Sequence, residues 1–252
     1  MSIVNTQLAY ILHKRAYRET SSVLEVLTKD YGRVALMARG CRGARSKIAG
    51  SLLLFTPLLI SWQGKGNLPY LKSVERADLK APALKNKSLL SAMYVNELLM
   101  YLLHKNDAHE AIFEHYHHCL YCLEDGKNLE ISLRQFEFKL LALLGFGLNV
   151  QTEADTGLPI NANAQYLYHL EYGPVLCRDA TLEEKSGKQN ADSAPQISGA
   201  CLLALAGESY QIVSDTPQYL SELKRLMRIV IQFHLGHKKL KSRELFRPVA
   251  RS

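Results

Sequence analysis

Closely spaced cations are the residues of this sequence best suited to binding chemistry. Residues 10–47 hold nine lysines and arginines against three acidic residues, with three short apolar runs between them. Positive charge gathered in one segment attracts polyanions, so we predict a nucleic-acid-binding surface here. A second basic segment, near the C-terminus, is predicted to bind nucleic acid as well. The predicted contact residues are Lys14, Arg15, Arg18, Arg33, Arg39, Arg42, Arg45, Lys47, Trp62, Lys65, Lys238, Lys239, Lys241 and Arg243.

Two of these features have a second interpretation. Trp62, with Tyr70, is suited to stacking on nucleic-acid bases, but Trp62 is equally suited to closing a hydrophobic core. The C-terminal segment from Lys238 to Arg243 suits a second polyanion site, which would hold another strand. It also suits a receptor for an acidic protein tail, so the sequence leaves both pairs of alternatives open.

Charge is segregated along the chain. Residues 1–80 carry 13 lysines and arginines against 5 acidic residues, and residues 222–252 carry 9 against 2, whereas residues 81–221 carry 9 against 17. Two basic ends around an acidic centre point to nucleic acid at the basic surfaces. The alternative is a solvated basic face that only aids solubility.

Other functional classes have little support. The sequence lacks a G-x-S-x-G, HExxH or Walker motif, so we expect no enzyme and no cofactor. His115, His118 and Cys122 share one helical face, but a single helix offers too few ligands for a metal, and we expect ordinary thiols and histidines there. No export signal or long apolar run is evident, and the five cysteines are irregularly spaced. We therefore expect free thiols and a cytoplasmic, nucleoid-associated protein.

Hydrophobic patterning predicts an α+β protein with two domains, 1–80 and 81–252. Branched residues alternate with polar ones in the first part, as in a small barrel of the OB type, with an SH3-like barrel as the alternative. From Ser88, a predicted N-cap, the periodicity becomes helical. The predicted strands are 7–13, 22–28, 33–38, 52–62, 70–75, 166–170 and 174–177, the helices 88–105, 108–124, 130–144 and 216–235, and the mobile loop 183–196.

Short motifs in a fixed order carry a family resemblance. They are YRET at 17–20, YGR at 31–33, ARGCR at 38–42, FTPLL at 55–59, YVNELL at 94–99, LRQFEFKLLALLGFGL at 133–148 and LKSRELFR at 240–247. With these the chain resembles the RecO family of bacterial recombination mediators over nearly its whole length.

The resemblance implies an OB-fold followed by a helical domain, and a role in DNA repair by recombination. The implied activities are binding of single- and double-stranded DNA, annealing, and loading of recombinase on strands coated with single-strand-binding protein. The implied partners are RecR and the acidic C-terminal tail of single-strand-binding protein, with RecF and RecA as further candidates. An apolar groove with a cation, in the helical domain, would suit that tail.

Many relatives carry a four-cysteine zinc module, which would fall on residues 150–180 here. The positions of its cysteines are occupied by Glu153, Thr156, Cys177 and Ala180. One thiol cannot form a tetrahedral zinc site, so we expect a degenerate module without metal. The rival functions are an RNA- or tRNA-binding OB-fold protein, and a protein adaptor that binds no DNA.

Overall fold

The computed structural model of the chain describes residues 2–43, 46, 48–177 and 194–245. The chain divides into two compact units, residues 1–129 with 240–252, and residues 130–239. Arg45, Lys47 and most of the predicted loop 183–196 lie outside the described residues. Every helix in the described part of the chain is too short or too polar to cross a bilayer.

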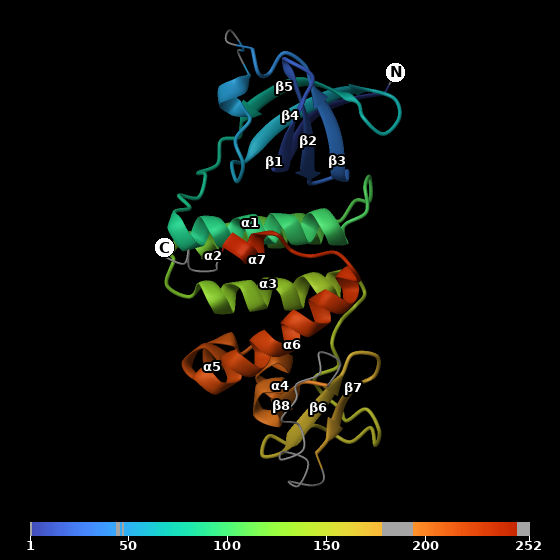
Figure 1. Cartoon of the computed structure of the whole chain (residues 1–252), viewed down its shortest axis with the longest axis vertical. Helices are drawn as coiled ribbons and strands as arrows, with labels where there is room; N and C mark the ends of the chain where they lie inside the picture. The colour runs from blue at the N-terminus through green and yellow to red at the C-terminus, as the bar shows by residue number, and fades with distance from the viewer. Residues whose placement is uncertain (1, 44–45, 47, 178–193, 246–252) are drawn as a thin grey trace, which may run out of the picture. The chain divides into compact units, whose positions relative to one another are not determined.

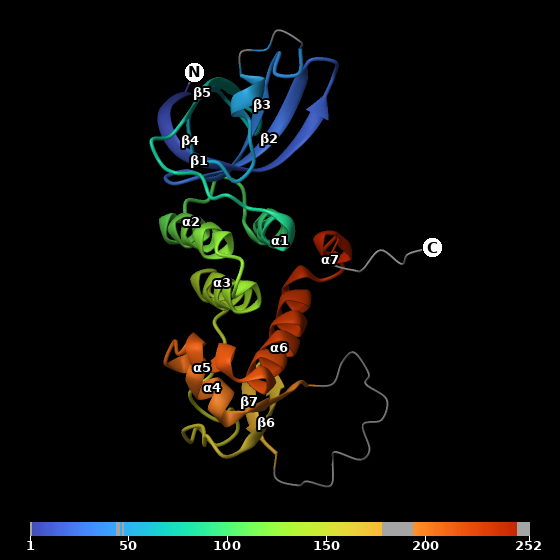
Figure 2. The ribbon, with the colours of Figure 1, turned by 90° about the vertical axis from the view of Figure 1, so that its left-hand side faces the viewer.

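The first unit begins with a closed five-stranded barrel (Figures 1 and 2). The strand order is β1-β2-β3-β5-β4, in which β3 and β5 pair in parallel and the other neighbours are antiparallel. This confirms the predicted α+β class with an OB-type barrel. The strands are β1 (Ser2–Tyr17), β2 (Ser21–Thr28), β3 (Gly32–Ala38), β4 (Leu58–Gly64) and β5 (Tyr70–Arg76).

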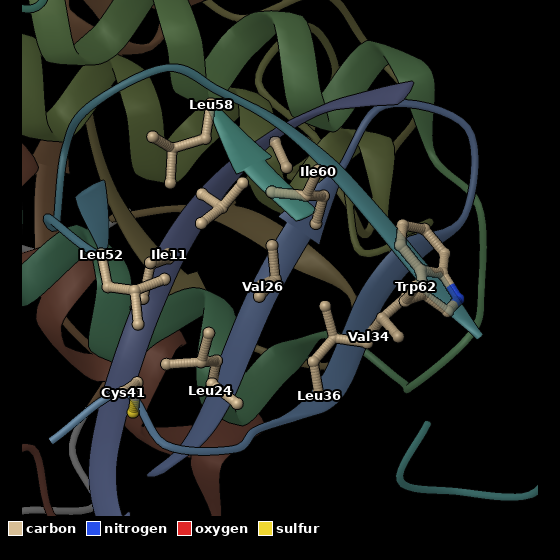
Figure 3. Close-up of a cluster of buried hydrophobic side chains, with 13 residues drawn as sticks. Ile11, Leu24, Val26, Val34, Leu36, Cys41, Leu52, Leu58, Ile60 and Trp62 are labelled. Carbon is tan, nitrogen blue, oxygen red and sulfur yellow. The ribbon is translucent and has the colours of Figure 1, made fainter. Parts of the chain in front are cut away.

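Every second residue of each strand points into the barrel, because successive residues of a strand point to opposite faces. These inward side chains fill the interior. Leu24, Val34 and Ile60 lie in this core, and Trp62 closes it with only 5% of its surface exposed (Figure 3). A 3-10 turn (Ala49–Ser51) leads from β3 toward Leu52, which packs in the same core. The predicted segment 52–62 is therefore a strand only from Leu58 onward.

Helices α1 (Asn86–Leu102), α2 (Glu110–Glu124) and α7 (Ser242–Leu245) complete the first unit. The prediction that Ser88 caps the first of these is wrong. The helix begins two residues earlier, after Lys85, and the Ser88 amide already donates to the Lys85 carbonyl at 3.0 Å. Ser88 is buried in the first turn, where its hydroxyl has no role as a cap.

A buried polar chain joins the barrel to α1 and α2. The Asn96 amide donates to the Leu12 carbonyl at 2.8 Å, and the Tyr116 hydroxyl donates to Asn96 Oδ1 at 2.7 Å. The Tyr10 hydroxyl and His117 Nδ1 are hydrogen-bonded at 2.6 Å. Tight packing also fixes the β2–β3 turn, because a Cβ on Gly32 would lie 1.7 Å from the Asp107 carbonyl oxygen.

The second unit consists of helices around a three-stranded sheet of order β7-β6-β8. Its first helix ends at Leu143, one residue before the predicted end at 144, and its last begins at Pro217, one residue after the predicted start at 216. The third strand and two short helices were not predicted. The elements are α3 (Leu129–Leu143), which starts at the boundary, β6 (Gln165–His169), β7 (Gly173–Leu176), β8 (Gln196–Ser198), α4 (Gly199–Ala206), α5 (Tyr210–Asp215) and α6 (Pro217–Leu235).

Candidate nucleic-acid interface

One end of the barrel presents cations and aromatic rings on a single outer face. Arg15 pairs with Val23, Val23 with Met37, and Met37 lies beside Tyr70 on the parallel strand β5. Residues directly opposite on paired strands point to the same face. Arg15 and Tyr70 therefore share this face with Tyr17, two residues beyond Arg15. All three are exposed, Tyr17 by 38% and Tyr70 by 40%.

Two arginines cover the aromatic rings on this surface. The Arg39 guanidinium lies 3.8 Å from the centroid of the Tyr70 ring, and that of Arg18 lies 5.3 Å from the Tyr17 ring. Such cation–π contacts hold a planar guanidinium parallel or close to an aromatic face. Each pair therefore offers a cation and a flat surface together.

The chain after β3 folds back onto the β1–β2 turn. The Arg42 amide donates to the Thr20 carbonyl at 2.9 Å, and Arg42 Nη1 donates to the Arg18 carbonyl at 3.2 Å. A guanidinium has five N–H donors, so one such bond leaves most of them for a phosphate. The bond brings the Arg42 side chain beside Arg18, although 24 residues separate the two in sequence.

The cations of this end have no acidic partners in the part of the chain that the structure describes. Lys65 joins them in the turn that leads from β4 into Tyr70, and exposed Lys72 follows two residues later on β5. Lys72 was not predicted as a contact. We call this set the open end of the barrel: it consists of Lys14, Arg15, Tyr17, Arg18, Arg39, Arg42, Lys65, Tyr70 and Lys72.

The structure corrects the predicted surface at two positions. Arg33 is only 11% exposed, because its guanidinium pairs with Glu25 at 3.1 Å and donates to the Leu103 carbonyl at 2.9 Å. Trp62 is part of the barrel core and meets the Tyr31 ring edge-on at 5.3 Å. Neither side chain is free to meet a phosphate or a base, and Trp62 has the core position that its second interpretation describes.

The basic C-terminal segment is anchored by a carboxylate. Glu97 on α1 accepts hydrogen bonds from the amides of Lys241 and Ser242, both at 2.9 Å, and from the Ser242 hydroxyl at 2.6 Å. Leu240 is buried in this segment, whereas Leu245 is 51% exposed. Lys238, Lys239 and Lys241 are exposed at their side chains, and Arg243 lies 5.9 Å from the ring of Tyr94.

The second unit has a pocket of about 270 Å³ beside the C-terminal end of α6. The rings of Phe146 and His234 stack there at 4.4 Å, and Phe233 and Tyr172 line it. Glu171 is its charged residue, and none of its described lining residues is a lysine or arginine. The pocket thus lacks the cation predicted for a protein-tail groove, and its lining is more polar than the predicted apolar groove.

Comparison with known proteins agrees with this architecture. The family model of the recombination protein O N-terminal domain matches residues 1–79, and that of the C-terminal domain matches residues 87–244. The chain belongs to the RecO family. Proteins named DNA repair protein RecO are similar over nearly their whole length: that of Nitrosococcus oceani is 42% identical over 97% of this chain and 94% of its own, and that of Methylococcus capsulatus is 40% identical over 95% and 91%.

The side chains of this RecO-family chain that were considered as metal ligands do not form a four-ligand site in the described residues. At the positions where the resemblance implied two of the zinc ligands, the Glu153 carboxylate accepts hydrogen bonds from the Thr156 hydroxyl at 2.6 Å and, farther along the chain, from the Tyr166 hydroxyl at 3.3 Å. Both of its oxygens are thus engaged by neutral hydroxyls. On α2, His118 Nε2 lies 3.2 Å from Cys122 Sγ, a pair without a third ligand. Within the described residues no group of three metal-ligating side chains comes together.

Proposed function

We propose that this protein binds single- and double-stranded DNA through the open end of its barrel, anneals complementary strands, and helps to load recombinase on strands coated with single-strand-binding protein. The supporting observation is the set of exposed cations at one end of an OB-type barrel without carboxylate partners in the described residues. Family membership supports the same assignment, since its relatives are named DNA repair proteins.

The mechanism is charge neutralisation rather than bond chemistry. Two DNA strands carry dense negative charge and repel each other as they approach. Each phosphate that pairs with a lysine or arginine releases condensed counterions, which favours binding and weakens that repulsion. The open end holds one strand near the protein, and a second basic surface would bring the other strand close enough to pair.

The C-terminal segment is our candidate for the second strand. Its cations Lys238, Lys239, Lys241 and Arg243 follow one another within six residues. Such spacing suits a long polyanion better than one carboxylate. The competing role is as receptor for the acidic tail of single-strand-binding protein. The pocket beside α6 is a weaker receptor for that tail, because Glu171 would repel it.

Annealing assays distinguish these roles. We expect a variant with all four cations changed to Ala to anneal naked complementary strands more slowly, while its binding of one strand changes less. If the segment serves the acidic tail instead, naked strands should anneal normally and coated strands should not. A charge-matched control changes Lys80, Lys85, Lys87 and Lys127, which are exposed elsewhere on the first unit. Parental rates on both substrates would leave the segment without either role.

Competition experiments address the rival functions and partners. At a fixed salt concentration, single-stranded DNA should displace structured RNA from the protein. The opposite order would favour the RNA-binding alternative, and a lack of any binding would favour a protein adaptor. We propose RecR as a protein partner, with RecF and RecA as further ones, and pull-down with each purified protein tests these contacts.

A further inference from the structure

Tyr70 occupies a position that a purely structural tyrosine would not need. Its ring lies on the outer face at the start of β5, it is 40% exposed, and its hydroxyl has no hydrogen-bond partner among the described residues. The neighbouring inward position, Leu71, packs against the barrel core instead. The ring thus contributes little to the core of the fold, and what it offers is a flat apolar surface toward solvent.

Arg39 makes this ring rigid and adds charge to it. Its guanidinium lies 3.8 Å from the ring centroid, close enough for one plane to stack on the other. The position is fixed by the backbone, because β3 meets β5 there and the Met37 amide donates to the Pro69 carbonyl at 2.8 Å. A stacked tyrosine and arginine, held by two paired strands, form a preorganised platform with a free outer surface.

We infer that the Tyr70–Arg39 pair is a base-stacking platform, which makes the open end prefer unpaired strands over duplex. The inference rests on the proposed function and deepens it. Aromatic and guanidinium planes stack on nucleic-acid bases of any sequence, whereas the bases of a duplex are already stacked inside it. A duplex can therefore use the cations of the open end but not the platform, unless a base is flipped out at a cost.

The second aromatic pair extends the platform. Tyr17 is 38% exposed beneath Arg18, and its strand partner Ser21 is next to Ser22, which pairs with Ala38 on β3. The two rings are therefore separated by three strand intervals, roughly 14 Å along the sheet. A single strand that crosses β1, β2, β3 and β5 would meet one ring with its arginine at each end of this path.

The test compares affinity and salt dependence for a fluorescein-labelled single strand and its duplex. Tyr70→Ala should weaken single-strand binding about five- to hundredfold, with an unchanged salt slope, and leave duplex binding within about twofold. Tyr70→Phe should bind like the parent, because it keeps the ring. Tyr172→Ala, which removes an exposed tyrosine of the second unit, is the matched control and should have no effect.

An abasic single strand provides an independent readout. The parent should bind it at least as weakly as Tyr70→Ala binds the normal strand, because Tyr17 also loses its base, and on the abasic strand Tyr70→Ala should bind as well as the parent. Equal losses on single strand and duplex, or no loss on either, would overturn the inference. A separate variant, Arg15→Ala/Arg18→Ala/Arg42→Ala, tests the proposed function. If that variant loses DNA binding and Tyr70→Ala does not, the platform fails while the proposed DNA site stands.

Discussion

The outer face of β1, β2 and β3 has two halves. In one half the cations form ion pairs with a carboxylate, and in the other, among the described residues, they do not. In the half beneath α1 and α2, Arg33 and Lys105 both pair with Glu25, at 3.1 and 3.0 Å. In the half toward the open end, Arg15 and Arg39 are exposed and have no carboxylate partner in the described part of the chain. Cations of one segment thus hold the fold together in one half and remain available to a ligand in the other.

The difference shows that the number of cations in a segment does not measure a binding site. Lys29 belongs to the same basic run, yet its ammonium lies 3.1 and 3.0 Å from carboxylate oxygens of Glu110 and Glu114. These hydrogen bonds raise the pKa of Lys29, and the bond to Glu114 has the larger effect. What separates the two kinds of cation is whether the fold brings a carboxylate to them.

The largest effect should follow from removal of the carboxylate in the covered half. Glu25→Ala leaves Arg33 and Lys105 unpaired, and Arg33 is nearly buried. Loss of one partner from a buried ion pair costs about 3–5 kcal/mol, so the free energy of unfolding should fall by about that amount. Urea denaturation measures it, with the exposed Glu75→Ala as control. Equal stability of the two variants would contradict the structural role of this half.

A carboxylate added to the open end should form ion pairs with its cations, as Glu25 does in the other half. Thr20→Glu places an acid at the turn where Arg42 donates to the Thr20 and Arg18 carbonyls, two residues along the chain from Arg18 itself. Two neutralised cations should lower the salt slope of DNA binding by about 1 to 2, with little change in stability. The neutral Thr20→Gln variant is the control. A slope that is the same for both variants would mean that these arginines do not contact phosphates.

Acid should weaken the joint between the barrel and its helices. Burial lowers the pKa of His117, which is hydrogen-bonded to Tyr10. The folded protein therefore binds this proton less readily than the unfolded chain does. The contribution of neutral His117 to the free energy of unfolding is fully present above the ordinary histidine pKa of about 6.5, and it is lost as the pH drops below that value. Burial also lowers the pKa of His234, so His117→Gln should remove only part of the pH dependence in thermal melts. An unaltered pH profile would contradict the role of His117.

The smallest effect should come from freeing a paired cation. Glu110→Gln with Glu114→Gln removes both partners of Lys29, which is 35% exposed at its side chain. The salt slope for duplex DNA should rise by at most about 0.9, the contribution of one phosphate contact. Adding Lys29→Gln should cancel the change. A rise that persists without Lys29 would have another cause.

Much of the fold followed from the sequence, because strand alternation and helical periodicity are local signals. Most of the barrel strands and the course of α6 from Pro217 were predicted on that basis. The sequence did not predict which cations form ion pairs, because their partners are distant along the chain, as Glu25 is from Lys105. The same is true of the hydrogen bond between Glu97 and Ser242, which are 145 residues apart. No local pattern encodes such contacts.

The aromatic residues teach the same lesson. Trp62 and Tyr70 both lie in predicted strands, and only the bulge between β4 and β5 and the strand pairing decide which ring enters the core. Tyr17 was missed because the predicted first strand ended at residue 13, whereas β1 runs on to Tyr17. Its use as part of the open end required the pairing of β1 with β2 and of β2 with β3.

The central claim is that the cations without partners at the open end, and not the basic segment as a whole, bind DNA. The most direct test is the salt dependence of duplex binding by Arg15→Ala/Arg18→Ala/Arg42→Ala. With three phosphate contacts removed, the slope of log K against log salt should become shallower by up to about 2.7. The charge-matched variant Lys85→Ala/Lys87→Ala/Lys127→Ala should keep the parental slope. A parental slope in the first variant, or an equal reduction in both, would contradict the account.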